Sequence, residues 1–206
     1  MSLFVDRLAT LDIVLIRHAE SVAPGTPGWE RRDDERPLSE AGLITAEELA
    51  DELEPYVIHA VYSSPYARAI QTITPLARRR GLEIQLLDDL RERRLTIAQR
   101  DDWRDHLMLA WSDPDYALEG AEAGRVAQQR GVRALDLLRV RHPDGGRIAV
   151  SSHGNLISLI LQTFEPGVDF AFHEAMPFPA IYHLQHDGIG WRVMGGHGFI
   201  EIAKTN

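Results

Sequence analysis

Residues 12–18 read DIVLIRH, and this stretch decides the fold class. After Asp12 come four apolar residues, three of them β-branched, which predicts a strand buried on both faces, as in parallel sheets. Two similar stretches occur at 57–62 and 147–151, and a turn and a helical pattern follow each of the three. Strands that alternate with helices predict an α/β fold, a three-layer sandwich whose largely parallel central sheet is flanked by helices.

Helix and strand signals fill the rest of the chain. Ser39 is a good cap for a helix that runs to about residue 53. Ser64-Pro65 starts a second helix, and Pro75 is expected to kink it or shift its register. We expect one domain over residues 1–206, with a possible small cap or insertion around 91–124. The remaining elements are predicted as helices over 96–110, 122–141 and 155–164 and strands over 83–87, 180–185 and 191–195.

The composition excludes several classes of protein. The 206 residues carry 22 Lys and Arg against 31 Asp and Glu, a net charge of −9, and no cysteine. Disulfide scaffolds, thiol nucleophiles and cysteine-bound zinc are therefore excluded. An acidic chain is a poor match for nucleic acid or an anionic membrane, and no apolar run approaches the roughly 18 residues that span a bilayer. The first residues lack the order of a signal peptide, so we expect a cytoplasmic protein.

Basic side chains follow three of the predicted strands. Arg17 and His18 follow the first, Arg68 lies shortly after the second, and His153 follows the third. Ligands of open parallel sheets bind at the carboxyl ends of the strands, so these four side chains are expected at one edge. Neighbours on a strand point to opposite faces, so Arg17 and His18 can share a site only if the strand ends there and turns at Ala19.

This set of side chains suits a phosphate group. Two guanidiniums and an imidazolium form an anion clamp, and a helix that begins near Asn155 would add backbone N–H groups and the positive end of its dipole. The remaining imidazole can attack phosphorus and form a phosphohistidine. A carboxylic acid must then protonate the leaving oxygen. Because fixed cations neutralise the phosphate, we predict neither a metal nor another cofactor.

The sequence resembles the histidine phosphatase superfamily, also called the phosphoglycerate mutase-like family, over about residues 12–165. Four segments match in order: LIRHAES at 15–21, PLSEAG at 37–42, YSSPYARAIQT at 62–72 and VSSHGNLI at 150–157. The resemblance implies a phosphoglycerate mutase-like fold and phosphoryl transfer through a phosphohistidine. It also implies a small phosphorylated substrate as the partner.

The resemblance also implies roles for individual residues. His18 corresponds to the phosphorylated nucleophile, and Glu92 lies where the family usually has its proton donor. Arg17, Arg68 and His153 correspond to the phosphate pocket. We add as further phosphate-contact candidates Ser21, Gly154 and Asn155.

The chain departs from the family pattern at several positions. Ala19 stands where glycine is usual, and Ser21 is the polar residue nearest to a position where the family often has Asn. The family's Gly-aromatic-Glu-Gly stretch does not follow Glu92 closely. Glu122 matches a Gly-Glu-Ser turn of the family, which makes it a candidate substrate contact. The competitors of Glu92 as proton donor are Asp88, Asp89 and Glu122.

The favoured interpretation is a phosphatase that works through phosphohistidine. The alternatives are a phosphoglycerate mutase-type phosphotransferase and a non-catalytic domain that binds phosphate or protein. His183 and His186 are a poor pair of metal ligands, because residues three apart on a strand face opposite sides. His173 and His197 are expected in loops or at the surface. Arg31 and Arg32 are expected on a solvated face; the alternative is that they flank the mouth of the site together with Arg36.

Overall fold

The computed structural model describes residues 9–23, 25–28, 31–95 and 101–199. Within these residues a central sheet has the strand order β3-β2-β4-β1-β5-β6. The last two strands of the chain, β5 and β6, pair antiparallel on either side of a turn at Asp187 and Gly188, as the sequence predicts. The strands are β1 (Leu11–Arg17), β2 (Ala60–Ser63), β3 (Ile84–Leu86), β4 (Gly146–Ser152), β5 (Ala180–His186) and β6 (Trp191–Gly196).

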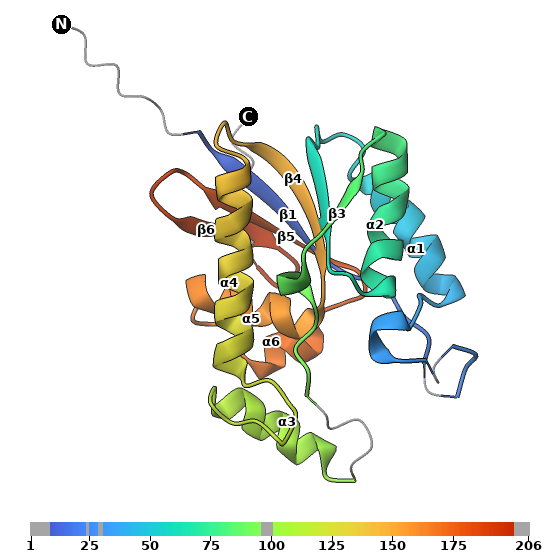
Figure 1. Ribbon diagram of the computed structural model, residues 1–206, viewed down its shortest axis with the longest axis vertical. Coiled ribbons are helices and arrows are strands. Elements are labelled where there is room, and N and C mark those ends of the chain that lie inside the picture. The colour runs from blue at the N-terminus through green and yellow to red at the C-terminus, as the bar shows by residue number, and fades with distance from the viewer. Residues whose placement is uncertain (1–8, 24, 29–30, 96–100, 200–206) are drawn as a thin grey trace, which may run out of the picture.

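Helices lie on both faces of this sheet (Figure 1). The α-helices are α1 (Glu40–Glu52), α2 (Ala67–Arg80), α3 (Trp103–Ser112), α4 (Gly124–Arg141), α5 (Gly154–Phe164) and α6 (Phe170–Ala175). Two short 3-10 helices are η1 (Asp33–Glu35) and η2 (Asp88–Leu90). None of the described helices is long and apolar enough to cross a membrane.

Four neighbouring strands of the sheet are parallel. β1 pairs with β4, β4 with β2 and β2 with β3 in this sense, whereas β5 runs antiparallel to both β1 and β6. The prediction of a largely parallel sheet flanked by helices is therefore confirmed. The parallel strands place their carboxyl ends at the same edge, where ligands bind in folds of this class.

The side chains of β1 alternate between the two helical layers. Leu11, Ile13 and Leu15 pack into a core with residues of α4 and α5, and Val14 and Ile16 pack into a second core with residues of α1 and α2. All five are buried. Burial on both faces explains why this strand is a continuous apolar stretch rather than an alternating pattern.

Several element boundaries differ from those expected. The helix expected over 96–110 is α3, which begins at Trp103, while residues 96–100 lie outside the described part. The second helix begins at Ala67 rather than at Pro65, because the Ser64 hydroxyl instead accepts from the Tyr66 N–H at 3.2 Å and holds a turn. This helix continues through Pro75 to Arg80 as one element. The short helix α6 has no counterpart in the sequence predictions.

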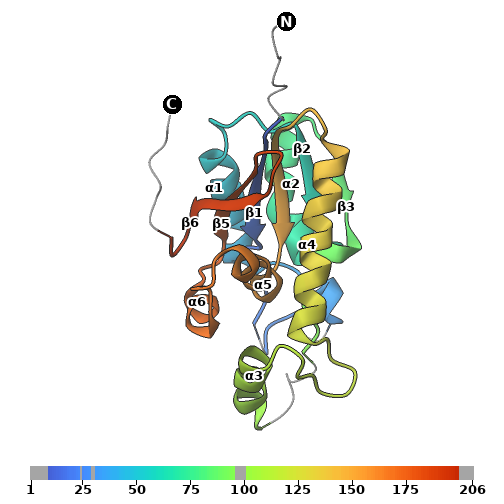
Figure 2. The same ribbon diagram turned by 90° about the vertical axis from the view of Figure 1, so that its left-hand side faces the viewer.

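The region expected to form a cap lies beyond one end of the sheet. α3 is placed past the beginning of α4, on the side of the molecule where α5 and α6 also lie (Figure 2). The carboxyl ends of β1 and β4 point toward this side (Figure 1). The candidate site therefore lies between the edge of the sheet and α3. That this region is a separate cap stays a prediction.

Candidate active site

The chain leaves the sheet directly after Arg17, the last residue of β1. The His18 N–H donates to the Ser152 carbonyl at 3.0 Å, and the Ala19 N–H donates to Thr72 Oγ1 at 2.9 Å. The strand thus ends where the shared site requires it to end. Arg17 and His18 both face the carboxyl edge of the sheet.

Ala19 fits the turn although the family usually has glycine there. The Ala19 side chain is buried in a small cluster with Leu38 and Ala46. Its methyl group fills space between the first loop and α1, so an alanine contributes packing here. Thr72, which holds the Ala19 N–H, also donates to the Arg68 carbonyl at 2.7 Å and so ties the turn to α2.

Hydrogen bonds define the tautomer of His18. Nδ1 lies 2.7 Å from the Ala19 carbonyl oxygen, which can only accept, so Nδ1 carries the proton. Nε2 lies 3.2 Å from Arg68 Nε, which can only donate, so Nε2 carries a lone pair. The His18 ring is therefore oriented with an unprotonated nitrogen at the guanidinium. An unprotonated imidazole nitrogen has the lone pair that a nucleophile needs.

The surroundings keep the His18 imidazole neutral. Burial and, after it, the positive charge of Arg68 together lower the pKa of His18 to about 3, although the hydrogen bond to the Ala19 carbonyl opposes the shift. Arg17 and Arg36 add smaller contributions of the same sign. A neutral His18 at neutral pH follows, because a charged ring would be both desolvated and repelled by three guanidiniums.

Arg68 lies in the first turn of α2 and is almost completely buried. Its guanidinium lies over the Tyr66 ring, 5.0 Å from the centroid. Its terminal nitrogens contact Asp33 in η1: Nη1 donates to the carbonyl oxygen at 2.5 Å and to Oδ1 at 3.3 Å, and Nη2 donates to Oδ2 at 3.3 Å. Asp33 also pairs with Arg36 at 3.0 Å. The carboxylate of Asp33 thus lies between two arginines near His18.

Arg17 is held by backbone and by an aromatic ring. Its Nη1 donates to the Met176 carbonyl, and its Cζ lies 3.3 Å from the centre of the Phe178 ring. A Cβ atom at Gly154 would come within 2.9 Å of Arg17 Nε, so a larger residue there would displace the guanidinium from the start of α5. Burial lowers the pKa of Arg17 to about 10, which leaves the group charged. Among the described residues, its buried Nε has no hydrogen-bond partner.

His153 follows β4 and is fully buried. The Ser64 hydroxyl accepts from Tyr66 N–H, so its own proton is available to His153 Nε2 at 2.8 Å. Nδ1 then carries the ring proton, and among the described residues this buried atom has no partner. The ring is 5.2 Å from that of His18, measured between centroids.

The structure bears on the charge expected for His153. Burial and the charge of Arg68 lower the pKa of His153 well below its usual value, which favours a neutral ring, whereas the sequence led us to expect an imidazolium. The positive charge of the site comes from arginines. The buried N–H groups of Arg17 and His153 that have no partner are the donors a phosphate oxygen needs.

Glu92 caps the helix that was expected to bind phosphate directly. Its Oε1 accepts from the Leu156 N–H at 3.1 Å and its Oε2 from the Asn155 N–H at 3.3 Å. The Arg93 N–H also donates to Oε1, at 2.8 Å. Burial raises the pKa of Glu92, while these hydrogen bonds and the charge of Arg68 oppose the rise. The result is a buried carboxyl group at the N-terminus of α5, the helix that begins directly after His153.

A model of the histidine phosphatase superfamily, branch 1, matches residues 13–195. The chain belongs to the histidine phosphatase superfamily. The comparison with curated proteins found no match to this chain. The match extends past the region of resemblance, through β5 and into β6.

Solved structures of this superfamily have the same fold. YhfR of Bacillus stearothermophilus is 25% identical, with 93% of this chain and 98% of that one covered and a TM-score of 0.74. A mycobacterial glucosyl-3-phosphoglycerate phosphatase is 24% identical over 89% and 97% of the two chains, with a TM-score of 0.69. A phosphoglycerate mutase of Bacillus anthracis is 18% identical over 91% and 92%, with a TM-score of 0.70. Phosphatases and mutases thus share the architecture of this superfamily member.

Other predicted contacts have different surroundings. Ser21 forms a short antiparallel bridge with Leu38, and its role toward phosphate stays a prediction. The buried side-chain oxygen Oδ1 of Asn155 has no partner among the described residues, while the backbone N–H of Asn155 donates to Glu92. Both carboxylate oxygens of Glu122 bind Arg130, at 2.9 and 2.8 Å. Glu122 is therefore engaged in an ion pair, whereas the sequence made it a candidate substrate contact.

The basic and histidine residues expected outside the phosphate clamp also differ in their surroundings. Arg36 lies close enough to lower the pKa of His18, but Arg32 pairs with Asp34 at the surface. His173 is not in a loop: it lies in α6, stacks on Trp111 at 5.1 Å and is within 3.3 Å of the Ser158 hydroxyl. Its neighbours come from α3 and α5, and the periodicity of the sequence does not indicate these contacts.

The sequence did not indicate three residues near His18 and His153: Asp33, Tyr66 and Phe178. Tyr66 lies in the matched segment 62–72, and its ring is 4.9 Å from that of His153. Phe178 lies 5.5 Å from the ring of His18. Asp33 lies in an acidic loop with no pattern of its own, so its contact with Arg68 could be found only from the structure.

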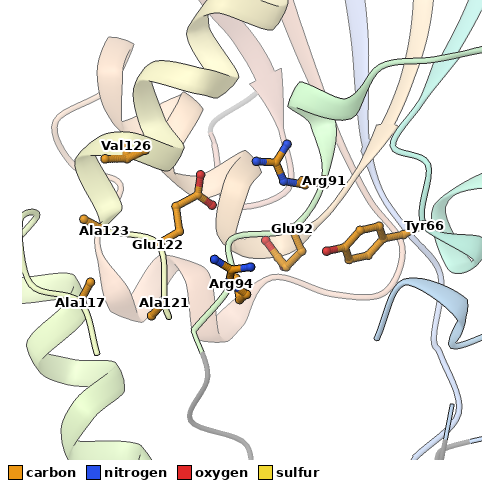
Figure 3. A pocket seen from close by; sticks show the side chains of 9 residues that line it. All are labelled: Tyr66, Arg91, Glu92, Arg94, Ala117, Ala121, Glu122, Ala123 and Val126. Atoms are coloured by element: carbon orange, nitrogen blue, oxygen red, sulfur yellow. The ribbon is translucent and has the colours of Figure 1, made fainter. Parts of the chain in front are cut away.

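A cavity of about 410 Å³ adjoins the site at Glu92. Along its wall Glu92 lies between Tyr66 and the segment that carries Glu122 (Figure 3). Small side chains make up much of the rest, with two arginines, Arg91 and Arg94. A volume of this order holds a small organic molecule.

Proposed function

We propose that the protein is a phosphomonoester hydrolase that acts on a small phosphorylated substrate through a phosphohistidine at His18, without a metal. The observation that carries the proposal is the unprotonated Nε2 of His18 against the buried guanidinium of Arg68. Nucleophile and charge stabilisation are in place before substrate arrives, which is what phosphoryl transfer needs most.

The first step transfers the phosphoryl group to the protein. The lone pair of His18 Nε2 forms a bond to phosphorus, and the bond between phosphorus and the alcohol oxygen breaks. Arg17, Arg68 and the Nδ1–H of His153 stabilise the charge on the non-bridging oxygens. Glu92, in its protonated form, gives its proton to the departing alcohol. A raised pKa supports this role, because it keeps part of the Glu92 population protonated at higher pH.

The second step releases phosphate. The Glu92 carboxylate takes a proton from a water molecule as the water oxygen attacks phosphorus, and the bond from phosphorus to His18 Nε2 breaks. Inorganic phosphate leaves, and both Glu92 and His18 return to their starting protonation states. The same carboxyl group thus serves as acid and then as base.

The cavity beside Glu92 supports the assignment of a small substrate. A group bound there would place its ester oxygen next to the proton donor. Related solved structures carry names of the same chemical kind, such as a phosphoserine phosphatase of Entamoeba histolytica in complex with phosphoserine and the glucosyl-3-phosphoglycerate phosphatase. We propose a phosphomonoester of comparable size.

The test is hydrolysis of a chromogenic aryl phosphate in the presence of a chelator. We expect turnover by the wild-type protein, an acid-labile phosphoenzyme, and loss of both in His18→Ala. Interconversion of 2- and 3-phosphoglycerate without net release of phosphate would replace the proposal by the mutase alternative. Absence of both turnover and phosphoenzyme would leave a phosphate- or protein-binding domain.

A further inference from the structure

The segment that carries Glu92 is held from behind by a buried arginine of α4. Arg130 is 3% exposed, and its Nη1 donates to the carbonyl oxygens of Asp89 at 2.7 Å and Arg91 at 2.9 Å. These two carbonyls lie three residues and one residue before Glu92. A single guanidinium therefore sets the path of the backbone into the proton donor.

Glu122 completes this support. Its carboxylate binds Arg130 with two hydrogen bonds, from Nε to Oε1 at 2.9 Å and from Nη2 to Oε2 at 2.8 Å. Its N–H donates to the Arg94 carbonyl at 2.7 Å, and its carbonyl accepts from Arg93 Nε at 2.9 Å. The pair of Arg130 and Glu122 thus contacts the backbone or side chain of residues on both sides of Glu92.

The position of Glu92 depends on this backbone path. Its carboxylate reaches the N-terminus of α5 through hydrogen bonds of 3.1 and 3.3 Å to two N–H groups. Hydrogen bonds of this length tolerate little displacement of the carboxylate. A shift of about 1 Å at a reacting group can cost on the order of a hundredfold in rate.

We propose that Arg130 and Glu122 are a positioning pair that holds the carboxyl group of Glu92 where it can protonate the leaving oxygen. The inference rests on the proposed function, in which Glu92 is the proton donor. We assign the pair no contact with the phosphate, because both oxygens of Glu122 bind Arg130 and all three guanidinium nitrogens of Arg130 bind Glu122 or backbone carbonyls.

The geometry of arginine is essential to this role. A planar guanidinium can donate to a carboxylate from two of its nitrogens while its third nitrogen donates to the backbone carbonyl oxygens. A lysine ammonium at the same place keeps the positive charge but lacks the coplanar pair of donor nitrogens that binds the carboxylate. Arg130→Lys therefore loosens the Glu92 segment without removing the positive charge from the interior.

The test compares two leaving groups. An alkyl phosphate such as glycerol phosphate needs a proton donor, whereas p-nitrophenyl phosphate, with a good leaving group, needs one much less. We expect Arg130→Lys to lower kcat/KM for the alkyl ester by about 30-fold or more and for the aryl ester by less than about threefold. In the Glu92→Gln background, Arg130→Lys should cause no further loss on the alkyl ester.

A matched control lies on the same helix. Arg125 makes the same two-nitrogen contact with a carboxylate, Asp115, at 2.6 and 2.9 Å, but at the surface, with its side chain 51% exposed. Arg125→Lys should leave both substrates unaffected. Glu122→Gln keeps the size and one acceptor of the pair, so it serves if Arg130→Lys fails to fold, and it should show the same preference for the aryl ester.

Four results would overturn the inference. Equal losses on both esters would mean that Arg130 supports folding alone, and an additional loss in the Glu92→Gln background would mean that it acts apart from Glu92. If wild type hydrolyses neither ester, the proposed function fails and the inference fails with it. If wild type is active and Glu92→Gln discriminates between the esters while Arg130→Lys does not, only the inference fails.

Discussion

Asp33 binds both terminal nitrogens of Arg68, the side chain whose Nε contacts His18, the proposed nucleophile. The Asp33 side chain is about half exposed, and that of Arg68 is 2% exposed. A phosphate that binds the terminal nitrogens of Arg68 would compete with this carboxylate for their N–H groups. The loop that carries η1 therefore competes with the substrate for the same cation.

Asp33→Asn should strengthen the binding of inorganic phosphate. The amide keeps the shape of the side chain but loses the charge that competes for Arg68. We expect the inhibition constant of phosphate in the aryl phosphate assay to fall by about tenfold, roughly 1.4 kcal/mol. Asp34→Asn is the control, because Asp34 lies in the same 3-10 helix and pairs with Arg32 at the surface. Weaker inhibition in Asp33→Asn would mean that Asp33 orients Arg68 for phosphate.

Arg68→Lys should lose most of the activity. A lysine cannot contact His18 Nε2 and also offer two coplanar donors to phosphate. We expect kcat/KM for the aryl ester to fall by about 10² to 10³-fold, the usual cost of removing a transition-state donor. Arg78→Lys, on the exposed side of α2 and paired with Glu47, should change little. Comparable rates for the two lysine variants would exclude Arg68 from the phosphate site.

Gly154→Ala should impair catalysis while the fold is kept. The added methyl group would lie 2.9 to 3.2 Å from three atoms of the Arg17 guanidinium, so Arg17 must move. We expect at least a roughly tenfold loss of kcat/KM, because displaced catalytic groups lose rate steeply. Gly167→Ala is the matched control, since a Cβ there meets nothing within 4 Å. Circular dichroism should show both variants folded; full activity of Gly154→Ala would argue against a fixed Arg17.

His18 should stay neutral well below the usual pKa of histidine. With a pKa lowered to about 3, its ring does not take up a proton as the pH falls from 8 to about 5. Nuclear magnetic resonance of the ring nitrogens should show one tautomer, protonated at Nδ1, across this range. His18→Asn identifies the signal. A titration midpoint near 6.5 would contradict the neutral nucleophile.

Stability should fall as the solution becomes acidic. The pKa values of the buried His18, His153 and His173 are all lowered in the folded protein, so the unfolded chain binds more protons below about pH 6.5. Each ring then lowers the free energy of unfolding by up to about 1.4 kcal/mol per pH unit. Urea unfolding at about pH 7.5 and pH 5.5 measures this slope. His173→Asn should make it shallower by one ring's share, and an unchanged slope would contradict the burial effect.

Much of the fold was predictable because its signals are local. The apolar stretch 13–16 indicates a strand buried on both faces, and β1 is such a strand. Ser39 caps α1 as predicted, through a hydrogen bond to the Gly42 N–H. The boundary at 64–67 was less well predicted, because a serine can hold a turn as readily as it caps a helix.

The sequence by itself determined the superfamily, the alternation of strands and helices, and the placement of Arg17, His18, Arg68 and His153 near strand ends. Each of these follows from a motif or from the repeat of a helix or strand. Tertiary structure alone decided which partners these groups meet. Asp33 binds Arg68 across 35 residues of chain, and Arg130 binds the Asp89 carbonyl across 41. Contacts between such distant segments depend on how the layers pack within a few ångströms, and no local pattern encodes that distance.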